Sequence, residues 1–141
     1  MFTEVLTHTN LDAAAADWQP AIDPIVEGDA AYNVMGDWAF TYYQTVKGLE
    51  FETGYNVAPS PGTTGVFNFL SDSFTLPVGA PHRDAAIKWL QLAGSKDGQD
   101  VFNPVKGSIP ARTDADPALY TGYLANPLQD WTNPATKIVG S

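Results

Sequence analysis

Residues 30–38 read Ala-Ala-Tyr-Asn-Val-Met-Gly-Asp-Trp, a short apolar run that ends in a glycine, an acid and an indole. The length and flanks of Ala30–Gly36 predict a buried strand. Asp37 is a good helix-capping residue, and the aromatic-rich segment Trp38–Thr45 that follows it is expected to be helical. A strand that leads directly into a helix is the repeating unit of an α/β fold.

Helix-like and strand-like segments alternate around this stretch. Asn10 to about Gly28 is expected to form helix in two pieces, because Pro20 and Pro24 lack a backbone N–H and interrupt it. Val66–Leu76 is rich in β-formers and predicts a strand, which the polar triplet Ser71-Asp72-Ser73 breaks in the middle.

Three further helices are expected in the second half of the chain. The first ends at Gly94 and carries an apolar stripe that consists of Ala86, Ile87, Leu90 and Ala93. The second begins at the capping Ser95 and ends at about Phe102, before Pro104, and the third begins within residues 114–117. The alternation indicates an α/β fold, and the length of the chain indicates one domain.

Composition excludes several classes of function. The chain has 141 residues, with Lys+Arg 7 against Asp+Glu 16 and a net charge of −9, so clustered cations that would neutralise nucleic-acid phosphates are not expected. Cysteine is absent, which excludes disulfides, thiolate metal sites and cysteine nucleophiles. No apolar run of membrane-spanning length occurs, and the first residues lack the pattern of a signal peptide.

Conventional catalytic and metal-binding patterns are not found. His8 and His82 are far apart in the sequence, and each is expected to be a solvated surface residue. No G-x-S-x-G elbow occurs, and Gly62-Thr63-Thr64-Gly65 has the wrong spacing for a phosphate loop and predicts a turn. The sequence therefore predicts no catalytic residue, no metal site and no cofactor.

Asp37 and Trp38 are candidate ligand-binding residues, because ligands in open α/β sheets gather beyond the carboxyl ends of strands. An indole offers a flat apolar face and a carboxylate offers two acceptors, a combination that suits a sugar. The alternative is that Trp38 is a core aromatic and that Asp37 only caps a helix, and for Asp37 the residues alone favour the cap.

Ser71, Asp72 and Lys106 are the other candidates. A carboxylate that interrupts an apolar strand must be solvated, paired or bound, because burying it alone is costly. Asp72 can instead be an edge-strand residue facing water, or a buried turn residue satisfied by backbone N–H groups. Lys106 follows Asn103-Pro104-Val105 on a constrained loop, where a lone lysine is usually solvated.

Taken together, three stretches of the chain resemble a known family. They are Met35-Gly36-Asp37-Trp38, the segment Gly65–Leu76, and Phe102–Arg112, which reads Phe-Asn-Pro-Val-Lys-Gly-Ser-Ile-Pro-Ala-Arg. In this order they resemble the sugar-binding proteins of bacterial ABC importers, the family 1 extracellular solute-binding proteins, and most closely the glucose/mannose-type branch. The similarity extends over essentially the whole chain.

The resemblance implies a hinged receptor of two lobes, with the periplasmic-binding-protein class II fold, that holds a monosaccharide between the lobes. Residues 1–141 are expected to form part of the C-terminal lobe, without the N-terminal lobe and the last helices. By the same resemblance Trp38 stacks on the sugar, and Asp72 and Lys106 hydrogen-bond its hydroxyls. The implied partners are membrane permease subunits, and the implied location is periplasmic or extracellular. Uncovered apolar surface is expected to cause self-association.

Two alternatives from other classes stay open. A tryptophan platform with Asp37 and Asp72 also fits a fragment of a carbohydrate-active hydrolase with paired carboxylates. The third hypothesis is a structural or assembly module in which Trp38, Asp72 and Lys106 are packing and capping residues.

Overall fold

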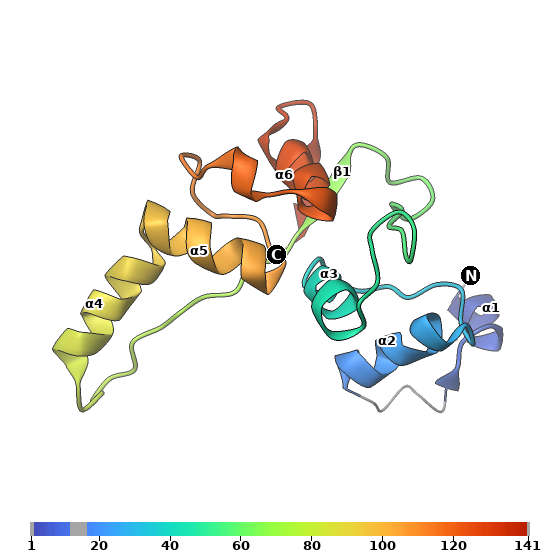
Figure 1. Cartoon of the computed structure of the whole chain (residues 1–141), viewed down its shortest axis with the longest axis horizontal. Coiled ribbons are helices and arrows are strands. Elements are labelled where there is room, and N and C mark those ends of the chain that lie inside the picture. Colours follow the sequence, from blue (N-terminus) through green and yellow to red (C-terminus); the bar gives the residue numbers. More distant parts are fainter. Residues whose placement is uncertain (1, 12–16, 141) are drawn as a thin grey trace. The chain divides into compact units, whose positions relative to one another are not determined.

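The computed structural model describes residues 2–11 and 17–140. The chain divides into two units, Met1–Gly36 and Asp37–Ser141, which are considered separately below. Figure 1 shows the elements coloured along the sequence.

The first unit contains α1 (Phe2–Thr7) and α2 (Trp18–Glu27). The Asp17 carboxylate accepts a hydrogen bond from the backbone N–H of Trp18, and Gly28 ends α2 with a φ of 85°. Ile22 is fully buried. The second predicted helical piece and its glycine end are therefore confirmed, whereas most of the first piece lies outside the described residues.

Pro20 and Pro24 do not interrupt α2, contrary to the prediction. Pro20 is the third residue of the helix, where a backbone N–H has no intrahelical partner in any case. Pro24 lies in the second half of the helix and removes one hydrogen bond, which α2 tolerates.

Residues 30–36 are irregular, so the predicted buried strand is wrong. The side chains of Tyr32 and Val34 are 91% and 93% exposed, and Asn33 Nδ2 donates to the Ala21 carbonyl at 2.8 Å. A strand requires a neighbouring backbone to complete its hydrogen bonds. Among the described residues, none pairs with this segment.

The second unit begins with a helix at the predicted place. α3 (Ala39–Thr41) runs directly into the π-helical turn η2 (Tyr42–Val46). Ala39 and Tyr42 are buried. Behind this helix lies an aromatic cluster in which the Tyr43 and Tyr55 rings stack with centroids 4.6 Å apart.

A parallel pair of strands gives the second unit its α/β character. β1 (Val66–Phe69) pairs with β2 (Lys137–Gly140) in the register Val66↔Lys137 to Phe69↔Gly140. α6 (Ala125–Thr132) packs on the pair, with the Trp131 ring stacked on Phe69 at 5.2 Å. The α/β class predicted from the sequence is confirmed.

β1 is shorter than the predicted strand. It ends at Phe69 because the paired register ends there, opposite Gly140, and residues 70–76 are irregular. The polar triplet that begins at Ser71 therefore lies beyond the carboxyl end of β1, where a polar side chain faces water without cost to a ladder.

The helices α4 (Arg83–Ala93) and α5 (Lys96–Lys106) follow β1 along the chain. The predicted stripe of α4 is confirmed, because its four members are half-buried while Lys88 and Trp89 between them are exposed. Ser95 caps α5 as predicted, its Oγ accepting from the backbone N–H of Gly98 at 3.0 Å.

The predicted end of α5 at about Phe102 is wrong, since the helix continues through Pro104 to Lys106. The fixed φ of proline is itself helical, and near a helix end the missing N–H removes only one bond. Gly107, with a φ of 84°, ends the helix.

The third predicted helix is two short 3₁₀ turns, η3 (Pro117–Leu119) and η4 (Gly122–Leu124), which lead into α6. The Asp116 carboxylate caps η3 by accepting from Ala118 N–H at 3.0 Å. Tyr120 and Leu124 between and within these turns are only 2% exposed each and belong to the core.

Candidate functional site

The site is built from three separate segments of the second unit: the entry to α3, the loop after β1 and the last turn of α5. Lys106 Nζ lies 2.9 Å from Asp72 Oδ2, and their side chains are 32% and 73% exposed. The two residues are 34 positions apart in sequence. A carboxylate with four lone-pair positions and an ammonium with three donors therefore stand together and remain open to solvent.

Asp37 belongs to the same electrostatic cluster. Its carboxyl group is half-buried, and burial raises its pKa above the ordinary value of 3.8. The Lys106 cation and the backbone N–H of Trp38 act in the opposite direction, and the Asp72 charge adds to the rise. The three predicted charged residues thus influence one another.

Trp38 and Ser71 adjoin this cluster along the chain. Trp38 is half-buried at the residue before α3, and Ser71 is exposed immediately before Asp72. The contacts of the described residues do not join either side chain to the Asp72–Lys106 pair. The capping interpretation of Asp37 has some support, since its carboxylate accepts from the Trp38 N–H.

Thr41 connects the entry of α3 to the end of α5, a role that the sequence did not indicate. Its hydroxyl donates to the Val105 carbonyl at 3.0 Å. A Cβ on Gly107 would lie 2.6 Å from the Thr41 Oγ1, so the two backbones approach closely at a position where φ is also positive. This contact places Lys106 beside the start of α3.

A polar network holds the loop behind Lys106. Asn103 is 7% exposed, and its Oδ1 accepts from the Ser108 hydroxyl at 3.0 Å. Gln99 Oε1 accepts from the backbone N–H of Ala111 at 2.9 Å, and the Gln99 carbonyl accepts from the Tyr120 hydroxyl at 3.4 Å. The only sequence signal for these residues was their place in or beside the Phe102–Arg112 stretch.

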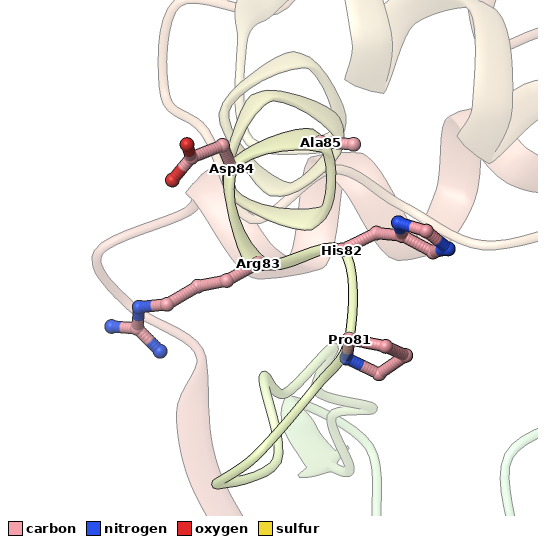
Figure 2. Close-up of a pocket in the computed structure, with 5 residues that line it drawn as sticks. All are labelled: Pro81, His82, Arg83, Asp84 and Ala85. Carbon is pink, nitrogen blue, oxygen red and sulfur yellow. The ribbon is translucent and has the colours of Figure 1, made fainter.

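A hollow of about 380 Å³ lies elsewhere, at the start of α4 (Figure 2). It is lined by residues 81–85, and none of the predicted site residues contributes to it. In Figure 2 the side chains of Arg83 and Asp84 point to one side of the helix start and that of His82 to the other. Groups that diverge in this way do not converge on a ligand, so we do not assign a site here.

Two surveys of residues 2–11 and 17–140 gave plain results. No cluster of three or more His, Cys, Asp or Glu side chains in this part of the chain is arranged to hold a metal ion. No helix within it has the length and apolar character needed to cross a membrane.

The raised pKa of Asp37 predicts how stability depends on pH. The folded chain holds this proton more tightly than the unfolded chain, so the resulting stability is present below pH 3.8 and is lost as pH rises through the folded pKa. Asp37→Asn is therefore expected to raise the free energy of unfolding at pH 7 and to leave it nearly unchanged below pH 3.8. Urea unfolding at both pH values measures this, with exposed Glu50→Gln as control. A loss of stability at pH 7 would contradict the sign.

Comparison with known proteins gives a family. Residues 2–100 match the family model described as bacterial extracellular solute-binding protein. An uncharacterized ABC transporter extracellular-binding protein of Pyrococcus horikoshii is 36% identical over 140 residues, which cover 99% of this chain and 31% of the relative. The match to the family model includes Asp37, Trp38, Ser71 and Asp72, and the match to this relative extends through Lys106 or close to the full chain.

Two further relatives carry sugar-binding names. The xylose/arabinose-binding protein XacG of Haloferax volcanii is 33% identical over 122 residues, 86% of this chain and 27% of the relative. A probable sugar-binding periplasmic protein of Mesorhizobium japonicum is 37% identical over 112 residues, 79% of this chain and 27% of the relative. The chain thus spans less than a third of the length of these relatives. It belongs to the bacterial extracellular solute-binding protein family.

Proposed function

We propose that this chain forms part of the C-terminal lobe of a sugar-binding protein that serves an ABC importer, with a monosaccharide of the glucose/mannose type as its solute. The observation that carries the proposal is the Asp72–Lys106 pair, which presents an acceptor and a donor to solvent beyond β1. The names of two of the relatives point to sugars as the class of solute.

Each predicted residue has a role in this proposal. Trp38 supplies a flat face for the C–H groups of the sugar, and Asp72 and Lys106 bond its hydroxyls. Ser71 offers a further hydroxyl, and Asp37 acts on the same cluster from the entry of α3. No covalent step is involved, so the proposed protein is a receptor rather than an enzyme. The membrane permease of the importer is its proposed partner, outside the cytoplasmic membrane.

Weak affinity is expected for the chain by itself. In hinged receptors, closure of two lobes surrounds the ligand and removes its hydroxyls from water. One lobe supplies only part of the hydrogen bonds, so glucose is expected to bind with a Kd of about 1 mM or weaker, which is about −4 kcal/mol or less favourable. Calorimetry that gives micromolar affinity would refute this expectation.

An NMR titration tests the site itself. In a sample with ¹⁵N-labelled tryptophan, added glucose is expected to shift the indole signal of Trp38, which Trp38→Phe identifies by its disappearance. The signals of Trp89 and Trp131, which lie on α4 and α6, serve as internal controls. If Trp38 does not respond at several hundred millimolar glucose while the chain is folded, the proposed site is wrong.

Self-association is also proposed for the isolated chain. Large apolar side chains are widely exposed in both units, among them Tyr32 at 91% and Val101 at 74%. Exposed apolar surface of this kind favours association, which buries it. Sedimentation over a hundredfold range of concentration is expected to show species larger than a monomer, and a constant monomer mass would count against this.

A further inference from the structure

The candidate site contains unequal numbers of positive and negative groups. The Asp72–Lys106 pair balances itself, with its atoms 2.9 Å apart. Asp37 is then left over: the charged side chains that act on its carboxyl group are Lys106 and Asp72 alone. With both carboxyl groups ionised, the three residues sum to one negative charge.

This excess charge is held in place by the backbone. The hydrogen bond from Thr41 to Val105 fixes the turn after Asp37 against the last turn of α5. Gly107 packs on Thr41 too closely for either segment to slide. Asp37 is half-buried, so water screens its charge less than it screens an exposed carboxylate.

We propose that the site accepts neutral polyhydroxy solutes, rejects their acidic counterparts such as uronates, and owes this discrimination to Asp37. The inference rests on the proposed function, since it concerns the same site. It goes beyond it by assigning Asp37 a role in selection by charge rather than a contact with the sugar.

The chemistry of the two solute classes explains the discrimination. A sugar hydroxyl both donates and accepts, so it satisfies Asp72 and Lys106 together without adding charge. A lysine alone would attract a carboxylate solute, but Lys106 is already neutralised by Asp72. An acidic solute would therefore meet the uncompensated Asp37 charge, and repulsion across a partly desolvated site is costly.

Paired titrations of the whole chain test the proposal. At pH 7.5 and low salt, glucose and galactose are compared with glucuronate and galacturonate by the shift of the Trp38 indole signal. We expect each neutral sugar to bind about tenfold or more tightly than its uronate, and this ratio to shrink about fivefold or more in Asp37→Asn. Asp37→Glu, which keeps the charge, and Asp84→Asn, an acid at the start of α4, should both retain the wild-type ratio.

Salt gives a second measurement that needs no variant. Raising the ionic strength from about 20 mM to 500 mM is expected to narrow the wild-type ratio, because it screens repulsion but not hydrogen bonding. Equal binding of neutral and acidic sugars overturns the inference while leaving the proposed function intact. A ratio unchanged in folded Asp37→Asn removes Asp37 from the role. If no sugar of either class perturbs Trp38, the proposed function fails and this inference fails with it.

Discussion

Lys106→Met is expected to weaken glucose binding at least tenfold, the largest effect of any single change at the site. The substitution removes the ammonium 2.9 Å from Asp72 and leaves the carboxyl groups of Asp72 and Asp37 without their cation. A partly desolvated charge without its partner costs more than the lost hydrogen bond itself. Methionine keeps most of the apolar stem, so packing along the side chain is preserved.

The measurement is the glucose titration of the Trp38 indole signal in the wild type and in the variant. Lys88→Met is the matched control, because Lys88 is an exposed lysine of α4. It removes the same charge from the chain and is expected to leave the titration unchanged. If Lys106→Met and Lys88→Met bind glucose alike, Lys106 does not contact the solute and the proposed site loses its donor.

Gly98→Ala is expected to have the largest effect on stability, about 2–3 kcal/mol of destabilisation. A Cβ at this position would lie 1.9 Å from the carbonyl oxygen of Leu92, at the corner where α4 leads into α5. The obstacle is backbone, which cannot rotate away as a side chain can. Relief requires the first turn of α5 to move and breaks the cap that Ser95 forms with Gly98 N–H.

Urea unfolding followed by circular dichroism measures this loss. Gly94→Ala serves as the control, because its Cβ would lie 3.3 Å from the Leu90 carbonyl and its backbone is right-handed. That variant is expected to differ from wild type by less than about 1 kcal/mol. Similar stability of the Gly98 and Gly94 variants would show that the corner between α4 and α5 is more open than described.

Local patterns in the sequence predicted local structure well. The stripe on α4 and the Ser95 cap of α5 follow from contacts within a few residues, and both are present. The strand predicted at residues 30–36 failed for the opposite reason. Its apolar composition satisfies a strand only where another strand lies beside it, and no residue pattern within seven positions reports whether one does.

Long-range pairing also explains what was not predicted at all. β2 has a short sequence, Lys137-Ile138-Val139-Gly140, and becomes a strand by pairing with β1, some seventy residues earlier. α6 has little helical signal of its own and contains Pro127, which is buried. Its place is set by the stacking of Trp131 on the strand pair.

The candidate site shows a similar division. A carboxylate interrupting an apolar run singled out Asp72, but nothing in the spacing joins it to Lys106, 34 residues away. The family resemblance named both residues, and the structure brings their charged atoms together. Thr41 and Gln99 were missed because each acts by hydrogen bonding to the backbone of a distant segment, which leaves no mark on the residue type.

The register that joins Val66 to Lys137 also constrains when this protein can fold on the ribosome. As the chain is synthesised from its N-terminus, β1 emerges first and has no strand to pair with until Lys137 and the residues after it have left the exit tunnel. α4 and α5 depend on contacts close in sequence and can form in the meantime, whereas the strand pair waits for closure of a long loop. During that interval Phe67 and Phe69 remain without Trp131, the ring that covers them in the finished fold, so a nascent chain arrested before residue 131 is the form that a chaperone would be expected to hold.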